Sequence, residues 1–207
     1  MLAARDALVR LKEGNGRFVS DASGRESAAT QARRQALAAG QEPFAIVLGC
    51  SDSRVPAEII FDQGLGDLFV IRVAGNIVAS SQVDSVEFAA ARYATKLVVV
   101  LGHTQCGAIL ATVEELKQPV ERRSRSLRSI VDRVRPSVEA LLAAGLDDGV
   151  LVAHAVRANI RASVDHLRHG SQVLERLIAT EGLVIVGAEY SLETGTVSFF
   201  DGVPGDW

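Results

Sequence analysis

Two short segments of this 207-residue sequence hold the residue types best suited to chemistry. The segment "GCSDSR" places Cys50, Asp52 and Arg54 at alternate positions, and "HTQC" supplies His103 and Cys106. These are the only two cysteines of the sequence. Zn²⁺ accepts thiolate, imidazole and carboxylate ligands in tetrahedral geometry, whereas thiolates disfavour Mg²⁺ and Ca²⁺. The two segments therefore predict a zinc site.

Neither segment is specific by itself. His-x-x-Cys also fits a buried free cysteine beside a histidine that bonds to the backbone, and Asp52–Arg54 also fits a loop ion pair. Structural zinc sites usually have Cys or His at all four positions, so an aspartate as fourth candidate is informative. Because Arg54 offers it a bidentate partner, Asp52 could leave the metal and open a position for water. Zinc lowers the pKa of bound water to about 7, which predicts attack of a zinc-bound hydroxide on a small electrophile.

Each segment directly follows an apolar run. "FAIVLG" (44–49) leads into Cys50, and "KLVVVLG" (96–102) leads into His103. Such continuous runs are typical of strands that are buried on both faces. In open parallel sheets, ligands bind outside the carboxyl ends of the strands. We therefore expect both cysteines and His103 to project from the same end of one sheet.

The rest of the sequence alternates between strand and helix patterns. Further strands are predicted at 67–75, 182–190 and 195–201. Helices are predicted at 2–18, 26–39, 56–64 (with Pro56 as first helical residue), 80–95, 107–117, 125–144 and 149–180, the last broken near Gly170. This alternation predicts an α/β fold with a mainly parallel four-stranded sheet and an added short edge strand, flanked by helices. We expect a single domain over residues 1–207, with residues 1–40 as an N-terminal helical arm.

Charge and hydropathy exclude several partners. The net charge of −3 gives no electrostatic case for nucleic acid or an anionic membrane as a partner. The basic run at 121–135 is interpreted as the solvated face of an amphipathic helix. No apolar run reaches the roughly 20 residues of a membrane span, and the charged N-terminus does not look like a secretory signal. We therefore expect a cytoplasmic protein.

Taken together, "CSDSR" and "HTQC", each after a buried strand, resemble the β-class carbonic anhydrases. The resemblance runs from about Leu8 through "CSDSRVPAEIIFDQGLGDLFVIRVAGN" to "IVGAEYSLETG". It implies reversible hydration of CO2 to bicarbonate and a proton. The implied permanent zinc ligands are Cys50, His103 and Cys106, and an implied Asp52–Arg54 dyad controls the fourth position. The resemblance also implies a homodimer or a larger assembly of dimers, with active sites at the dimer interface and N-terminal helices that embrace the neighbouring subunit.

Four positions are candidates for the substrate pocket. Gln41 matches a glutamine that hydrogen-bonds substrate in plant-type members, and a surface role for it is equally compatible with the sequence. Phe69 matches an apolar wall of the pocket, and Phe88 stands where plant-type members carry a tyrosine. Gly107 either allows close backbone approach to the site or simply begins a helix.

The resemblance leaves regulation and proton transfer open. Allosteric bacterial members hold bicarbonate with a Trp, a Gly and a Tyr, and the matching positions here are Val47, Gly49 and Tyr190. Because the tryptophan is missing, this regulatory site is not expected in its usual form. The remaining histidines lie on one predicted helix and are interpreted as surface or structural residues, one of which could relay protons: His154, His166 and His169.

Two other functions stay open at this point. One is a zinc hydrolase of the same fold that acts on another small electrophile, such as CS2 or COS. The other is a non-enzymatic scaffold or bicarbonate sensor, in which two cysteines, one histidine and one aspartate close the zinc permanently.

Overall fold

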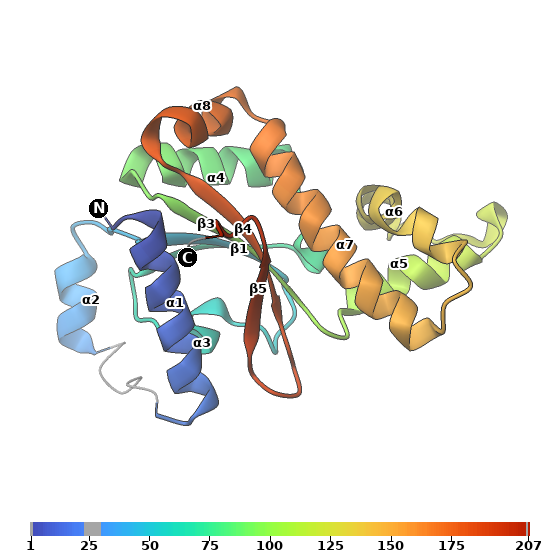
Figure 1. Ribbon diagram of the computed structural model, residues 1–207, viewed down its shortest axis with the longest axis horizontal. Coiled ribbons are helices and arrows are strands. Elements are labelled where there is room, and N and C mark those ends of the chain that lie inside the picture. Colours follow the sequence, from blue (N-terminus) through green and yellow to red (C-terminus); the bar gives the residue numbers. More distant parts are fainter. Residues whose placement is uncertain (1, 23–29, 206) are drawn as a thin grey trace.

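A five-stranded sheet runs through the centre of the molecule (Figure 1). The computed structural model describes residues 2–22, 30–205 and 207. The strand order is β2-β1-β3-β4-β5, and the strands are β1 Ala45–Gly49, β2 Leu68–Arg72, β3 Leu97–His103, β4 Val184–Tyr190 and β5 Val197–Asp201. The first four strands are mutually parallel, and β5 pairs antiparallel to β4 at one edge. The predicted sheet, four parallel strands plus an edge strand, is confirmed.

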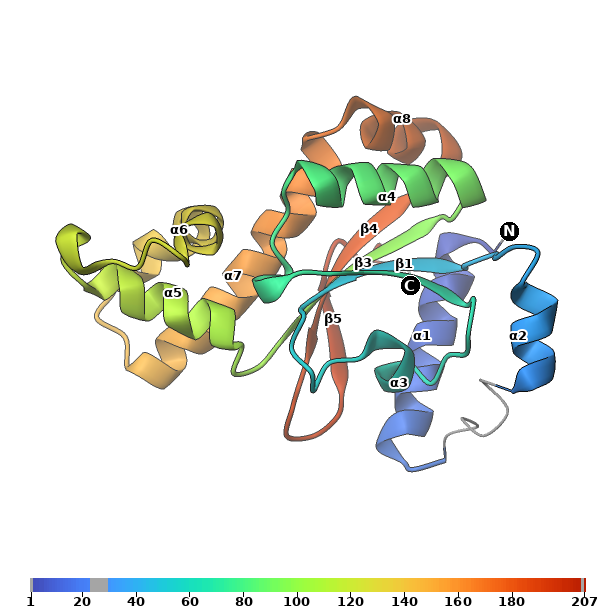
Figure 2. The same ribbon diagram turned by 180° about the vertical axis from the view of Figure 1, so that it is seen from behind.

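Helices cover both faces of this sheet (Figures 1 and 2). On one face lie α1 (Ala4–Val19) and α3 (Ala57–Ile60), and on the other lie α4 (Ser80–Tyr93), α7 (Asp148–His169) and α8 (Gln172–Glu181). Helices α5 (Gly107–Lys117) and α6 (Arg128–Leu142) pack with α7 to one side of the sheet. The α/β fold flanked by helices is thus as expected.

The alternation of side chains along the strands explains the two cores. Successive strand residues point to opposite faces. Ile46 and Leu48 accordingly belong to the core under α4, α7 and α8, whereas Val47 belongs to the core under α1. Every residue of β1 and β3 is buried, which accounts for their continuous apolar sequences.

Helix α1 packs on the sheet of its own chain. Leu8 and Leu11 are buried in the core that also contains Val47 and Phe61. The helix includes Gly14 because an added Cβ there would lie 1.9 Å from the carbonyl oxygen of Phe61. A role of residues 1–40 as an arm on a neighbouring subunit stays a prediction.

Several predicted boundaries differ from the structure, among them those of two helices and one strand. Helix α2 spans Gln31–Leu37 and therefore ends two residues before the predicted Ala39. Its N-cap is Thr30, whose side chain accepts a hydrogen bond from the backbone of Arg33. Residues 26–29 of the predicted helix lie outside the described residues. Helix α3 is shorter than predicted, and Pro56 is its N-cap rather than its first residue, because its ψ of 111° is extended. The predicted strand 67–75 stops at Arg72, where a short 3-10 turn, Ala74–Asn76, follows.

The basic run behaves largely as expected. In α6, Val131, Val134 and Val138 are buried while Arg128 and Arg133 are exposed, so the helix is amphipathic. Among the described residues, no helix combines the length and apolar character that a bilayer crossing requires.

Candidate metal centre

The carboxyl ends of β1 and β3 bring the predicted metal ligands together. These two strands are parallel neighbours, with Gly49 beside Leu101. Cys50 directly follows β1, and His103 is the last residue of β3. Gln105 adopts a left-handed φ of 54°, which turns the chain so that Cys106 stands at the N-terminal cap of α5. The predicted meeting of the two segments at one end of the sheet is confirmed.

The three candidate ligand side chains form one buried cluster. The ligand atoms of Cys50, His103 and Cys106 all lie within 4.8 Å of one another. The two sulfur atoms are 3.9 Å apart, and both cysteines are free. Two thiolates at the usual Zn–S distance of about 2.3 Å from one tetrahedral ion lie about 3.8 Å apart. The spacing of the sulfurs therefore suits two ligands of a single zinc ion.

The tautomer of His103 also suits a metal ligand. The Nδ1 atom lies 2.9 Å from the carbonyl oxygen of Thr104, which can only accept, so Nδ1 carries the proton. The Nε2 atom is buried and has no hydrogen-bond partner among the described residues. A buried nitrogen with an unused lone pair costs free energy unless a partner satisfies it. A metal ion bound beside Cys50 and Cys106 would be that partner.

Asp52 stands beside this cluster and is held by Arg54. The Arg54 side chain donates from Nε to Asp52 Oδ1 (2.9 Å) and from Nη2 to Oδ2 (2.8 Å), and the Arg54 backbone N–H also donates to Oδ1 (2.9 Å). Asp52 Oδ2 lies 3.8 Å from His103 Nε2. The hydrogen bonds from Arg54 hold the pKa of Asp52 below its usual range. The carboxylate is thus ionised, adjacent to the cluster, and occupied by the guanidinium.

The two cysteines of the cluster have very different pKa values. Hydrogen bonding from the Cys106 thiol lowers the pKa of Cys50 to about 4, against the effect of burial and with help from His103. The same bond, together with burial, raises the pKa of Cys106. Burial by itself would lower the pKa of His103, but its contacts with Cys50 and the Thr104 carbonyl raise it overall. A metal ion must therefore displace a proton that the two sulfurs hold between them.

Two residues that position the cluster carry no signal in the sequence. Arg72, at the end of β2, donates from Nε to the carbonyl of Cys50 (3.0 Å) and from Nη2 to that of Asp52 (2.6 Å). The backbone N–H of Gly75 donates to Cys50 Sγ (3.3 Å). Both contacts depend on how β2 and the turn after it lie beside β1, which residue types and spacing do not reveal.

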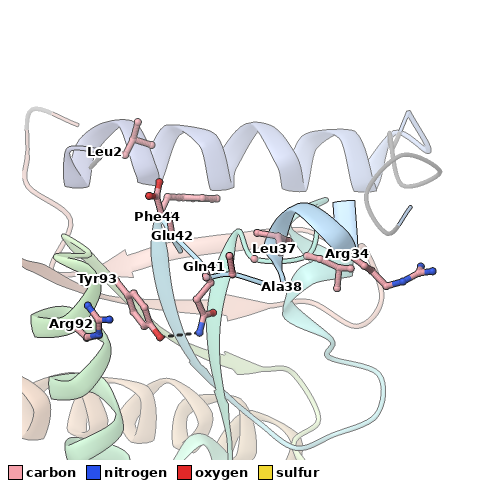
Figure 3. Close-up of a pocket in the computed structure, with 13 residues that line it drawn as sticks. Leu2, Arg34, Leu37, Ala38, Gln41, Glu42, Phe44, Arg92 and Tyr93 are labelled. Carbon is pink, nitrogen blue, oxygen red and sulfur yellow. Dashed lines mark hydrogen bonds between the residues drawn. The ribbon is translucent and has the colours of Figure 1, made fainter. Parts of the chain in front are cut away.

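Gln41 lies away from the cluster of its own chain. Its Nε2 donates to the Tyr93 hydroxyl (2.9 Å), and the two side chains point toward one another in Figure 3. Gln41 lines an open cavity of about 1140 Å³ together with Arg34 and Arg92. None of the three cluster residues lines this cavity. The substrate role of Gln41 stays a prediction.

The other pocket candidates are divided between an aromatic group and a helix start. The rings of Phe69, Phe88 and Tyr93 lie within 5.9–6.2 Å of one another, and 53% of Phe88 is exposed. Gly107 is the first residue of α5, and an added Cβ would meet no described atom within 4 Å. Packing within the chain therefore does not require this glycine, and its role toward a substrate stays a prediction.

The residues singled out for regulation and proton transfer lie as follows. Val47 and Gly49 are in β1, and Tyr190 is buried at the end of β4 beside His103. The remaining histidines all lie at exposed positions of α7, which confirms their assignment to the surface: His154, His166 and His169.

Comparisons with known proteins agree on one family. A family model described as carbonic anhydrase matches residues 45–197. Carbonic anhydrase 2 of Mycobacterium tuberculosis is 43% identical over 191 residues, which cover 89% of this chain and 87% of that protein. The carbonic anhydrase of Mycolicibacterium smegmatis is 40% identical over 187 residues, covering 90% and 88%.

Solved structures are similar over most of the chain. The β-carbonic anhydrase CafA of Aspergillus fumigatus matches with a TM-score of 0.74 and 25% identity, covering 98% of this chain and 92% of that one. A β-carbonic anhydrase of Sordaria macrospora, described as tetrameric, matches with a TM-score of 0.71 and 27% identity, covering 81% and 85%.

Proposed function

We propose that this chain, which belongs to the β-carbonic anhydrase family, catalyses the zinc-dependent, reversible hydration of carbon dioxide to bicarbonate and a proton. The observation that carries the proposal is the buried cluster of Cys50, His103 and Cys106 where β1 and β3 end. The spacing of its sulfurs and the free Nε2 of the histidine both support a zinc ion as cofactor. When bound, zinc supplies the nucleophile, because it lowers the pKa of a coordinated water to about 7.

Each cluster residue has a distinct task in this proposal. Cys50 and Cys106 would hold the ion with thiolates, and His103 would hold it through Nε2. The carbonyl of Thr104 keeps the proton of His103 on Nδ1, so that Nε2 stays available. Since Cys50, His103 and Cys106 are all buried, they would keep bulk water from their side of a bound ion.

Asp52 and Arg54 would control access to the fourth position. With Arg54 on both of its oxygens, Asp52 is ionised and can accept a hydrogen bond from the attacking water species, which would orient it toward carbon dioxide. Asp52 is also the exchangeable fourth ligand of the proposal, because Oδ2 lies close to the ligand nitrogen of His103. The carboxylate would bind the metal when Arg54 does not hold it.

The substrate pocket would be completed by a second subunit. In the aromatic group of Phe69, Phe88 and Tyr93, Phe88 is exposed and the other two rings are partly buried, and a homodimer could bury this surface. Such a dimer would explain why Gln41 lies away from the cluster of its own chain, since it could serve the neighbouring site. We include Gln41, Phe69, Phe88 and Gly107 as substrate contacts on this basis. A cytoplasmic location is part of the proposal, because free thiol ligands persist in a reducing compartment.

Stopped-flow measurement of CO2 hydration, on protein whose zinc content is known, tests the proposal. Cys50→Ser is expected to lose both zinc and activity, because serine is a poor zinc ligand. Ser51→Ala, at the exposed neighbouring position, is the control and should keep both. A Cys50→Ser protein that still binds one zinc per chain and hydrates CO2 would show that the ligand assignment is wrong.

The same assay separates the other two functions. Turnover of CS2 or COS well above that of CO2 would point to a different small electrophile. A chain that binds zinc but hydrates no CO2 would instead be the closed scaffold or sensor.

A further inference from the structure

The 3-10 turn after β2, Ala74–Asn76, contacts the sulfur of Cys50 and contains two residues with left-handed backbone angles. Gly75, whose N–H donates to Cys50 Sγ (3.3 Å), has φ 70° and ψ 19°. The next residue, Asn76, is also left-handed, with φ 43°. Two successive left-handed residues, one of them not glycine, are uncommon and persist where the surrounding structure holds them.

Helix α7 supplies that support with two side chains. Asn159 Nδ2 donates to the carbonyl of Gly75 (2.8 Å), and Ser163 Oγ donates to the carbonyl of Asn76 (3.0 Å). The two residues are one helical turn apart and therefore share a face of α7. Both are buried, so neither bond competes with bulk water.

Two glycines in the sheet, Gly102 in β3 and Gly187 in β4, allow α7 to pack closely against these strands. An added Cβ on Gly102 would lie 2.5 Å from Ile160, and one on Gly187 would lie 2.9 Å from the same side chain. Ile160 is the residue after Asn159, and Gly102 immediately precedes the ligand His103. The seating of α7 on β3 and β4 thus places Asn159 over the turn that contacts Cys50.

We infer that Asn159 is a positioning residue for the metal centre, acting through Gly75 to keep an amide N–H on the Cys50 sulfur. This inference rests on the zinc site of the proposed function. A hydrogen bond to a thiolate stabilises its negative charge and fixes its direction. It also reduces the charge that the sulfur donates to the metal, which matters where two of three permanent ligands are thiolates.

Zinc release tests this role without using turnover. Asn159→Leu has a similar size but no donor, so the zinc-loaded protein should lose its metal to a chromogenic chelator about 10–100-fold faster than wild type. The matched control is Asn15→Leu. Asn15 is a buried asparagine that donates to the carbonyls of Ile60 (3.2 Å) and Gly195 (2.8 Å), neither of which belongs to the cluster or to the turn beside Cys50. Its loss should lower the melting temperature but leave zinc release within about twofold of wild type.

Equal acceleration of zinc release in both variants would mean that general destabilisation is the cause and would overturn the inference. Release from Asn159→Leu at the wild-type rate would overturn it too. Should Asn159→Leu fail to fold, the smaller change Asn159→Ser, whose hydroxyl is too short to replace the amide donor, takes its place in the same assay.

A second measurement uses the wild-type chain. With ¹¹³Cd in place of zinc, NMR should show a scalar coupling between the metal and the Gly75 amide proton, transmitted through the N–H···S bond. A folded, cadmium-loaded protein without this coupling would overturn the inference. The coupling without CO2 hydration by the zinc form would refute the proposed function alone, and hydration without the coupling would refute this inference alone.

Discussion

Replacing Arg54 with glutamine tests how the fourth position of the metal is controlled. Arg54→Gln removes the two side-chain hydrogen bonds to Asp52 and leaves the backbone one in place. The released carboxylate lies close to the ligand nitrogen of His103, with Oδ2 at 3.8 Å. We expect it to occupy the metal for a larger fraction of the time, so that CO2 hydration slows while the zinc content stays the same.

The size of the effect follows from the exposure of the pair. Hydrogen bonds to charged groups contribute about 1.5–3 kcal/mol, whereas exposed ion pairs contribute about 0.2–1 kcal/mol. The Asp52 side chain is 17% exposed and that of Arg54 is 53% exposed, which places this pair between the two cases. We therefore expect a decrease of at most about 5- to 30-fold in the rate at pH 7.

Protonation of Asp52 would not account for that decrease. Arg54 lowers the pKa of Asp52, so removing Arg54 raises this pKa back toward the ordinary value of about 3.9. A group with a lowered folded-state pKa loses its stabilising pairing only as the pH falls through that pKa. At pH 7 the carboxylate is ionised with or without Arg54, and the pH–rate profile at neutral and alkaline pH should keep its shape.

The assay is stopped-flow CO2 hydration with zinc measured on the same sample. Arg17→Gln is the matched control, because it removes a comparable contact to Asp62 (2.6 Å) from an arginine whose side chain is 43% exposed. It should leave the rate unchanged. An Arg54→Gln enzyme with the wild-type rate would refute control by the dyad. One that loses zinc would show that Arg54 supports the cluster itself.

Three further outcomes are expected. Gly14→Ala should lower the free energy of unfolding by about 1–3 kcal/mol in urea titrations, because the new Cβ would clash with the Phe61 carbonyl. Gly16→Ala, whose Cβ would meet no atom within 4 Å, should raise it by about 0.5–1 kcal/mol. Equal effects of the two substitutions would contradict the packing argument. Zinc uptake at pH 7 should release at least one proton, because the raised pKa of Cys106 keeps its thiol protonated before the metal binds. At pH values below the raised pKa of His103, a further proton should be released from the imidazole. Calorimetric heats of zinc binding that do not depend on the ionisation enthalpy of the buffer would refute this. Phe88→Glu should weaken subunit association in sedimentation experiments, and an unchanged oligomer would exclude this face from the dimer interface.

The clustering of Cys50, His103 and Cys106 could be predicted because its geometry is mostly local. Cys50 directly follows β1 and His103 ends β3, and the apolar sequences of both strands predict them. Neighbouring parallel strands have their carboxyl ends at the same edge of the sheet. Only the adjacency of β1 and β3 had to be assumed. The contacts of Arg72 and Asn159 are different in kind, since they join residues 22 and 84 positions apart through the seating of whole elements.

Helix boundaries were missed for a related reason. Short helices such as α3 have few periodic residues to mark their ends, so the difference between an N-cap and a first residue at Pro56 depends on a single backbone angle. The break between α6 and α7 was easier to predict, because Gly145 adopts a left-handed φ of 64° that glycine tolerates best. A glycine that ends a helix can thus be recognised in the sequence, whereas the ends of short helices depend on tertiary packing and cannot.

In the proposed function, two sets of residues would control the metal site. The proposed permanent ligands are buried, and Asn159 of α7 donates a hydrogen bond to the carbonyl of Gly75 in the turn beside Cys50. Asp52 and Arg54 lie in the loop after β1, partly exposed and joined mainly to each other. Changes in α7 should therefore alter how tightly zinc is retained, whereas changes in the dyad should alter the rate at constant zinc.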